Sequence, residues 1–430
     1  MTPVRRAADR TFRSLRVRNY RLYFLGQGVS LTGTWMQSVA QAWLVLKLSG
    51  GGLALGLVTA LQFLPVLLAG PWGGLVADRA DKRRLIVITQ SVSGALALGL
   101  GILTVTGVAS LPIVYVFAFL LGIVTLVDMP ARQAFVIEMV GARDVANAVS
   151  LNGVVMNAAR IAGPVLAGLL IATLGIGPCF LANAVSYAAV VAAFVAMRPR
   201  ELFPTERVPR GKGQLREGLR YVWSRTELRV PLLLMAVVGT LAYNFSVVFP
   251  LIVKDAFHGG PGAYGLVFAA MGAGAVVGGL VVAARGRATN RLLVLSMLGL
   301  GALLVLAALA PAFGLELAVM VPVGAASTAF IATSNSLLQL GASDRMRGRV
   351  MALFSVVFLG STPIGGTLIG WFSERFGPRA GLLLGGAATV VAGLVGLLLL
   401  RKEPRRRARK RLDPVVMPAP APALALRPSS

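Results

Sequence analysis

The stretch LIVITQSVSGALALGLGILTVTGVASLPIVYVFAFLLGIVTLV occupies residues 85–127 and contains no Asp, Glu, Lys or Arg. Two further stretches, 161–197 and 350–373, also lack these four residue types. A bilayer core about 30 Å thick is crossed by a helix of about 20 apolar residues. In hydrocarbon the backbone must satisfy its own hydrogen bonds, which favours helices over loops or open strands. The sequence therefore predicts an all-α membrane protein that crosses the bilayer many times.

Twelve apolar segments can be drawn along the chain, six on each side of a basic loop at 198–229. They span residues 20–47, 53–77, 85–106, 111–129, 145–174, 177–197, 230–254, 262–284, 291–310, 315–338, 348–373 and 379–400. The two sets share short patterns in the same order: LGLV at 55–58 recurs as YGLV at 264–267, GGLV at 73–76 recurs at 278–281, and Pro164 parallels Pro363. Two parallel six-helix bundles related by an axis along the membrane normal are therefore predicted, an arrangement typical of transporters.

Positive charge is placed unevenly along the chain. Of 42 Lys and Arg residues, 37 lie at the termini or in alternate gaps between the segments. Such charge gathers in loops that stay cytoplasmic, so both termini and the middle loop are expected on that side. The net charge of +26 would also suit a nucleic-acid binder, but the alternation favours a topology signal, and no nucleic-acid partner is expected. The excess of Arg over Lys, 36 to 6, together with abundant Ala and Gly, indicates a GC-rich bacterial genome. For a bacterial protein with this many crossings we expect the cytoplasmic membrane.

These patterns divide the chain into five regions. The divisions are a basic cytoplasmic N-terminal segment (1–19), an N-terminal bundle (20–197), a cytoplasmic linker (198–229), a C-terminal bundle (230–400) and a basic, Pro/Ala-rich disordered tail (401–430). Within the linker the apolar residues recur at helical spacing with arginines between them, at Leu215, Leu219, Val222 and Trp223. This spacing predicts an amphipathic helix at the cytoplasmic interface of the bilayer.

Residue types needed for metal, disulfide or enzyme chemistry are scarce. Cys179 is the only cysteine and His258 the only histidine, which excludes disulfides and cysteine or histidine metal clusters. No Walker lysine motif and no catalytic constellation are visible. We expect no cofactor, no metal, no enzymatic activity and a monomer embedded in the lipid bilayer.

The first segment carries polar residues along one side. At 100° per residue, five polar side chains fall on one stripe about 80° wide: Gln27, Ser30, Thr34, Gln37 and Gln41. Polar packing between helices would explain two or three of them, whereas a continuous stripe favours a wet pathway. Tyr243 and Asn244 in the seventh segment are candidates for the facing wall of the same cavity.

Arg160 is the only charged residue inside its apolar segment. An isolated charge at this depth is costly and usually faces a cavity or a partner. Asn152 and Met156 share its helical face, which favours the substrate pathway. A structural ion pair or snorkelling to a helix end is the alternative.

The turn GLVADRADKRR at 74–84 places acids beside a cluster of cations. Such charges can form strong bonds to a neighbouring helix, and Gly70 and Gly74 have the spacing that permits close helix approach. The alternative is a plain basic turn that only sets topology.

This turn resembles the loop signature of the major facilitator superfamily, with Asp81 in place of the usual glycine. Five further stretches resemble its enterobactin-exporter-like and macrolide-efflux-like branch of drug:proton antiporters: FRSLRVRNYR at 12–21, SLTGTWM at 30–36, DMPARQAF at 128–135, LN at 151–152 through ARIAGP at 159–164, and EGLRY at 217–221. The resemblance covers about residues 12–400. It implies twelve helices in two bundles, a central cavity and alternating access by rocking.

The resemblance also assigns roles to particular residues. It implies a conformational lock on the cytoplasmic face that includes Gly74, Asp78, Arg79, Lys82 and Arg83, with Asp128 as acid partner, and the second-half copy lacks the acid. Gly163, Pro164 and Gly168 resemble the glycine-proline motif of the fifth helix, where Pro164 would produce a kink. The fourth-helix arginine of many proton antiporters is missing from 111–127.

The function expected from these observations is secondary transport, most simply proton-coupled export of drugs or siderophore-like small molecules. Three alternatives stay open at this stage: a lipid or lysophospholipid flippase of the same fold, a membrane receptor, or a membrane enzyme.

Overall fold

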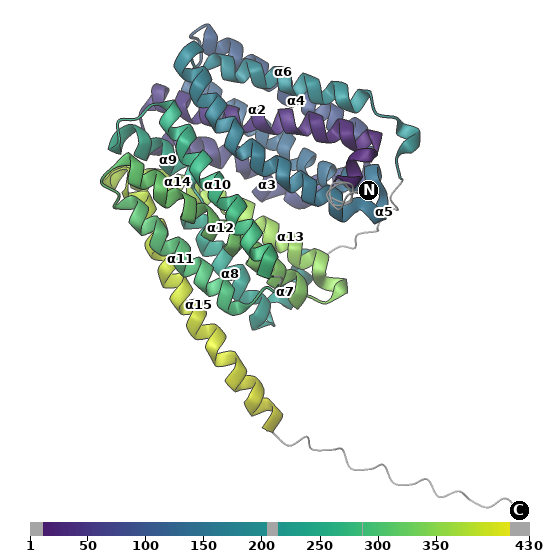
Figure 1. Cartoon of the computed structure of the whole chain (residues 1–430), viewed down its shortest axis with the longest axis vertical. Coiled ribbons are helices and arrows are strands. Elements are labelled where there is room, and N and C mark those ends of the chain that lie inside the picture. Colours follow the sequence, from purple (N-terminus) through teal and green to yellow (C-terminus); the bar gives the residue numbers. More distant parts are fainter. Residues whose placement is uncertain (1–11, 204–213, 286, 413–430) are drawn as a thin grey trace, which may run out of the picture.

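The computed structural model describes residues 12–203, 214–285 and 287–412, and in these ranges every regular element is a helix (Figure 1). The first half contains η1 (Arg13–Arg16), α2 (Arg18–Ser49), α3 (Gly52–Arg79), α4 (Lys82–Val105), α5 (Leu111–Leu174), α6 (Gly177–Val195) and η2 (Pro199–Glu201). The second half contains α7 (Gln214–Trp223), α8 (Thr226–Leu241), α9 (Phe245–Leu251), the π-helical η3 (Ile252–Ala256), α10 (Pro261–Arg285), α11 (Asn290–Ala308), α12 (Phe313–Gly341), α13 (Asp344–Gly360), α14 (Thr362–Phe376) and α15 (Ala380–Leu412). The predicted all-α membrane fold is confirmed.

Within the described ranges, ten helical runs are long and apolar enough to cross a membrane. One of them, α5, has 64 residues, enough for two crossings, and Gly141 with φ 71° interrupts its helical backbone. The 32-residue α2 lies outside the ten because polar side chains lower its hydropathy, yet it packs along α5 and α6. Counted in this way, the described part of the chain provides twelve crossings.

The crossings form two groups, α2–α6 and α8–α15, which Figure 1 shows side by side. In the first group α3 packs on α5 and α4 packs on α6; in the second, α10 packs on α12 and α11 packs on α15. The groups touch each other mainly through α3 with α14 and through α5 with α10. Each group thus has its own interior, and only a few helices form the boundary between them.

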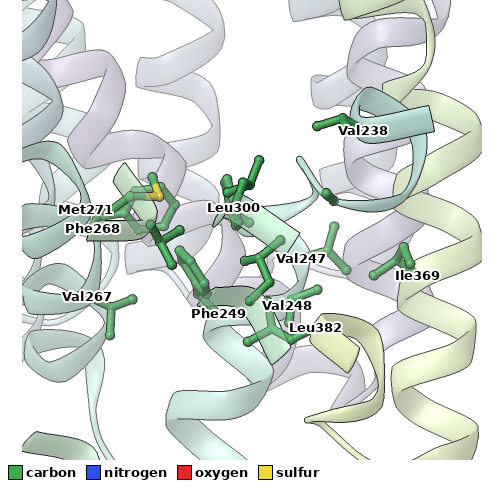
Figure 2. Packing of buried hydrophobic residues seen from close by; sticks show 14 of the residues in the cluster. Val238, Val247, Val248, Phe249, Val267, Phe268, Met271, Leu300, Ile369 and Leu382 are labelled. Carbon is green, nitrogen blue, oxygen red and sulfur yellow. The ribbon is translucent and has the colours of Figure 1, made fainter. Parts of the chain in front are cut away.

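Aromatic residues fill the interior of the second group. Figure 2 shows Phe249 of α9 beside Phe268 of α10, with ring centroids 5.5 Å apart in an edge-to-face arrangement. A Cβ atom added at Gly381 would clash with the Ser373 hydroxyl and would also crowd Ile369 (3.1 Å) and Val248 (3.2 Å). The glycine therefore allows α9, α14 and α15 to approach closely.

The N-terminal motif FRSLRVRNYR joins the start of α2 to two other helices. Ser14 of η1 donates its backbone N–H to the Asn147 side-chain oxygen (3.0 Å), and Arg13 pairs with Asp144 (2.8 Å). Asn19 exchanges two hydrogen bonds of 2.9 Å with the backbone of Arg198. The tertiary contacts of this motif therefore fix the start of α2 against the middle of α5 and the end of α6.

The amphipathic helix predicted in the linker forms as α7. Gly218 and the buried Val222 face α13, where Glu217 pairs with Arg349. Leu219 and Trp223 are exposed, at 46% and 53%. One face of α7 is thus docked on the second group, and the other offers apolar side chains to its surroundings. The rest of the linker, residues 204–213, lies outside the described residues.

The last helix is longer than the sequence suggested. The disordered tail was expected from residue 401, but α15 continues to Leu412. Arg, Lys and Ala are strong helix formers, and they extend an existing helix without the cost of nucleation. Residues 413–430 lie outside the described residues.

Candidate functional site

The two groups meet at one end of their helices, called the closed end below. A Cβ atom added at Gly56 of α3 would lie 2.4 Å from the backbone oxygen of Gly366 in α14. A Cβ atom added at Gly265 of α10 would lie 2.4 Å from the backbone oxygen of Pro164 in α5. Gly56 and Gly265 occupy the same place in the repeated patterns LGLV and YGLV. The internal repeat of the sequence therefore corresponds to two matching close contacts between the groups.

Two charged side chains also bridge the groups at the closed end. The Glu374 carboxylate, at the end of α14, accepts a hydrogen bond of 2.8 Å from the backbone N–H of Leu53 in the first turn of α3. Lys254 of η3 donates to the carbonyl of Leu46 in the last turn of α2, at 3.5 Å. Acids at helix N-termini and cations at C-termini are both favourable because of the helix dipole. The short α2–α3 connection is thereby held from both sides by the second group.

A cavity of about 220 Å³ lies next to this contact. It is lined by residues of α2, α3, α5, α6, α9 and α10, including Trp35, Gln62, Phe63, Tyr187, Ser246, Tyr264 and Phe268. Three members of the predicted polar stripe, Thr34, Gln37 and Gln41, lie in its wall. The wall combines aromatic rings with a few amide and hydroxyl groups, which is the usual composition of a small-molecule pocket.

The polar stripe of α2 divides into two parts with different surroundings. Gln27 accepts a hydrogen bond of 3.0 Å from Arg132, and Ser30 is buried at 1% exposure. Gln37 accepts a bond of 2.6 Å from Asn183 of α6 while also lining the cavity. Gln27 therefore serves polar packing between helices, and Thr34 and Gln41 line the cavity. Gln37 does both.

Arg160 of α5 lies at the boundary between the two groups. Its guanidinium stacks over the ring of Trp35, 5.2 Å from the centroid, and its Nε is buried without a hydrogen-bond partner among the described residues. Tyr243 from the second group is close enough to interact with it electrostatically. Among the described residues no acidic side chain pairs with Arg160, so its guanidinium is held by the aromatic face of Trp35 and lies near the Tyr243 phenol. Arg160 and Tyr243, which the sequence predicts separately as pathway residues, thus lie close together although they come from opposite halves.

Tyr243 and Asn244 lie at the break between α8 and α9. The Tyr243 hydroxyl donates to the carbonyl of Ser327 (3.1 Å), and the Asn244 amide donates to the carbonyl of Thr240 (2.7 Å). The Asn244 Oδ1 atom is buried without a partner in the described part of the chain. Broken helices at membrane depth are tolerated where they face protein or a cavity. The break therefore leaves one buried polar atom, Asn244 Oδ1, without a described partner.

The other two residues predicted on the Arg160 face differ from each other. Asn152 donates a hydrogen bond of 3.2 Å to the Tyr23 hydroxyl, and its own oxygen is buried without a described partner. Met156 is 42% exposed. Asn152 thus belongs to the packing of α2 on α5, whereas Met156 presents an open apolar surface one turn from Arg160.

The predicted lock residues separate into two clusters. Lys82 pairs with Glu138 of α5 at 2.6 Å, and Arg83 donates to the carbonyls of Phe194 and Val195 at the end of α6. Asp128 instead pairs with Arg132, four residues along its own helix. In this conformation Asp128 is therefore not the partner of the cations in the turn. Asp78 is half-buried and has an interaction partner, and Arg79 is exposed.

Asp128 is the centre of a buried polar network. Its carboxylate accepts hydrogen bonds from Thr89 (2.6 Å) and Gln90 (3.0 Å) of α4 in addition to the pair with Arg132. Arg132 continues the network to Gln27 of α2. Thr89 and Gln90 are not among the residues predicted from the sequence, although they are two consecutive polar residues inside an apolar segment. The network joins α2, α4 and α5 within the first group.

Close helix approach beside the turn occurs at a different glycine from the one expected. A Cβ atom at Gly73 would lie 2.1 Å from the backbone oxygen of Leu126, whereas one at Gly70 would meet nothing within 4 Å. Pro130 removes the donor that would bond the Leu126 carbonyl within α5, which leaves this oxygen available to α3. Gly74, the residue after Gly73, is half-buried.

The glycine-proline motif of α5 contacts one helix of each group, α2 and α10. A Cβ atom at Gly163 would meet Trp35 at 2.5 Å, and one at Gly168 would meet the backbone of Gly262 at 2.7 Å. Helical φ/ψ continues through Pro164, and Gly141 is the residue at which α5 departs from it. The motif thus lets α5 approach α2 on one side and α10 on the other.

The closed end gives a direct mutational prediction. Gly56→Ala is expected to disfavour closure, because the methyl group would overlap backbone, which cannot rotate away. Gly70→Ala on the same helix is the matched control, since its Cβ meets nothing. In a Cys179→Ser background, a cysteine at Thr59, in the cavity wall, should react faster with a water-soluble maleimide added at the closed end in the Gly56→Ala variant. Equal rates in the two variants would contradict the role of this contact.

Among the described residues there is no group of three or more His, Cys, Asp or Glu side chains that could hold a metal ion.

Comparison with known proteins agrees with this architecture. Residues 10–430 match the family described as transmembrane secretion effector. The chain is 24% identical to the staphyloferrin A transporter of Staphylococcus aureus, over 88% of this chain and 96% of that protein. It is 28% identical to the multidrug efflux pump Tap of Mycolicibacterium fortuitum (86% and 92% covered) and 24% identical to macrolide efflux protein A of Streptococcus pyogenes (88% and 96% covered).

A solved structure supports the fold. A bacterial homologue of the human lysosomal transporter Spinster, in an inward-facing and unoccupied conformation, superposes with a TM-score of 0.71 at 16% identity, covering 92% of this chain and 98% of that one. On the family match over residues 10–430 and the relatives it resembles, the chain belongs to the transmembrane secretion effector family of major facilitator transporters.

Proposed function

We propose that this transporter exports drug-like or siderophore-like small molecules across a bacterial cytoplasmic membrane, by alternating access coupled to the proton gradient. The observation that carries the proposal is the cavity of about 220 Å³ at the meeting point of the two halves, with aromatic and amide groups in its wall. The relatives that resemble the chain over nearly their full lengths transport staphyloferrin A or expel drugs and macrolides. A mixed aromatic and polar wall suits bulky amphipathic compounds.

Arg160 and Tyr243 are proposed to contact the substrate or to sense its presence. Each comes from a different half, and the Arg160 Nε lacks a described partner. A substrate carboxylate, hydroxyl or carbonyl would satisfy that donor, and its aromatic part would stack on Trp35, as the guanidinium does now. Binding would therefore depend on both halves and change when they rock.

The closed end is proposed to face the outside of the cell, so that the structure is inward-facing. The basic loops lie at the opposite ends of the same helices, and positive charge favours the cytoplasm. The five divisions of the chain proposed from the sequence follow the same topology, with the exception of the longer α15.

Topology has its own test. Cysteines placed in residues 107–110 are expected to react with a membrane-impermeant maleimide added to intact cells, whereas cysteines in 206–212 should react only after the cells are opened. Residues 107–110 form the exposed connection between α4 and α5. Reaction of the second group in intact cells would reverse the orientation.

Export can be tested by measuring how much of a compound accumulates inside cells. Cells that produce the protein should hold less of a transported compound than cells without it, and a protonophore should remove the difference. Macrolides and iron-free siderophores are the first two sets of compounds to compare. An unchanged accumulation across both sets would contradict the proposed substrate class, and a difference that survives the protonophore would contradict proton coupling.

A further inference from the structure

Glu316 is a buried carboxylic acid to which none of the roles above applies. It lies in the first turn of α12, at the closed end, and is 1% exposed. Neither of its carboxylate oxygens has a hydrogen-bond partner among the described residues. An ionised carboxylate without partners in apolar surroundings is very costly, and such a group binds a proton instead. The surroundings therefore suit the neutral acid.

Arg379 is the charged residue that acts electrostatically on Glu316. It does not pair with the acid in this conformation; its guanidinium stacks over the ring of Phe257 at 5.3 Å. Phe257 in turn contacts Phe313, in the same helical turn as Glu316, with ring centroids 5.7 Å apart. Arg379 thus has two possible partners close to each other, an aromatic ring and an acid.

Other titratable groups near this place are turned away or distant. Asp255 and His258, which flank Phe257, are exposed. Tyr264 of α10 is buried and contacts Phe268 in the cavity wall. On the helices that pack against α12, the remaining described charged residues lie at the basic ends: Glu227, Arg229, Arg285, Arg291, Arg347 and Arg349. Arg379 is accordingly the group with which an ionised Glu316 would pair.

The segments that carry Arg379 and Phe257 are the segments that bridge the two halves. Arg379 follows Glu374, which binds the first turn of α3, and Phe257 follows Lys254, which binds the last turn of α2. Opening of the closed end must break both of these bonds and move both segments. The same movement would disturb the stack of Arg379 on Phe257 and admit water to Glu316.

We propose that Glu316 is a proton-binding site on the outer side of the second half, and that its protonation is coupled to closure of that side. In the closed state the carboxyl holds its proton in an apolar pocket. On opening, the proton passes from a Glu316 oxygen to external water, and the carboxylate pairs with Arg379. On closure, a proton from external water returns. The orientation rests on the proposed function, whereas the coupling of protonation to closure stands without it.

The sign follows from linkage. Because the closed state binds the proton more tightly, low pH favours closure, and closure is lost as the pH rises through the range in which Glu316 ionises. One linked proton changes the closed-to-open ratio by at most tenfold for each pH unit, about 1.4 kcal/mol at 25 °C.

The test reads conformation and protonation without substrate. Spin labels at Val108→Cys and Gly260→Cys, two exposed positions at the closed end of opposite halves, are introduced in a Cys179→Ser background in lipid nanodiscs. In the otherwise unchanged protein the short-distance population should fall as the pH rises from about 5 to about 9. Glu316→Gln, a neutral mimic of the protonated acid, should stay closed at every pH. Asp255→Asn, an exposed acid next to the same site, should keep the pH response.

A second variant and a second measurement keep the test decisive if Glu316→Gln fails to fold. Arg379→Gln removes the partner of the ionised acid, so the pH response should move to higher pH. Infrared difference spectra should show a protonated-carboxyl band that Glu316→Gln lacks. An unchanged pH response in Glu316→Gln, or a carboxyl band that survives it, would overturn the proposal. Failure to find an exported substrate would leave both measurements interpretable, so the two proposals fail separately.

Discussion

Arg160→Ala is expected to abolish transport or change its specificity while membrane insertion stays intact. The substitution removes the stacked guanidinium beside Trp35 and the cation beside Tyr243 from the boundary between the halves. It also removes a buried donor without a described partner, so stability should change little or improve. Efflux from cells and the amount of protein in the membrane are measured side by side.

Two further variants sharpen this expectation. Arg160→Lys keeps the charge but loses the planar fork and its stacking, so partial activity is expected. Asn157→Ala is the control, because the Asn157 amide bonds the Gly153 carbonyl of its own helix, and its loss should leave efflux unchanged. Normal efflux by Arg160→Ala would exclude this residue from the pathway.

Asp128→Asn is expected to lower the stability of the first group by about 3 kcal/mol. Removing one partner of a buried ion pair leaves the other charge uncompensated, at about 3–5 kcal/mol. The lower figure applies because the Arg132 side chain remains 25% exposed, whereas that of Asp128 is 4% exposed. Thermal unfolding in detergent would measure the change.

The controls for Asp128 come from the same network and from the neighbouring turn. Asp128→Leu combined with Arg132→Met removes both charges and should recover much of the loss. Asp81→Asn should have almost no effect, because Asp81 caps α4 through the Arg84 N–H and Asn caps a helix as well as Asp. Equal melting temperatures for Asp128→Asn and Asp81→Asn would contradict the importance of the network.

The all-helical membrane fold could be predicted from the sequence alone because each membrane crossing is encoded by its own run of apolar residues. A charge-free run such as 85–127 has one stable form in hydrocarbon, and this needs no knowledge of neighbouring helices. The same holds for α7, whose apolar spacing is local. The repeat of LGLV as YGLV also predicted two related halves, and Gly56 and Gly265 are equivalent contact points between them.

Partnerships between residues could not be predicted in this way, because they depend on how helices far apart in sequence face each other. Asp128 seemed a partner for the basic turn, but it pairs with Arg132 of its own helix and accepts hydrogen bonds from α4. Lys82 of the turn meets Glu138 instead. The stripe of α2 was visible as a 3.6-residue pattern, yet only packing divides it between Arg132, Asn183 and the cavity.

The sequence thus established how often the chain crosses the membrane, where its charge lies and which residues are polar inside it. Tertiary structure established which of these polar residues are satisfied and which are not. Glu316 shows the difference most clearly: as one acid near a helix start it carries no signal, since a helix N-terminus ordinarily favours an acid. It becomes a candidate site only because Arg379 stacks on Phe257 and both carboxylate oxygens are left buried. Burial and partner choice depend on the sum of many weak packing contacts, which no local pattern records.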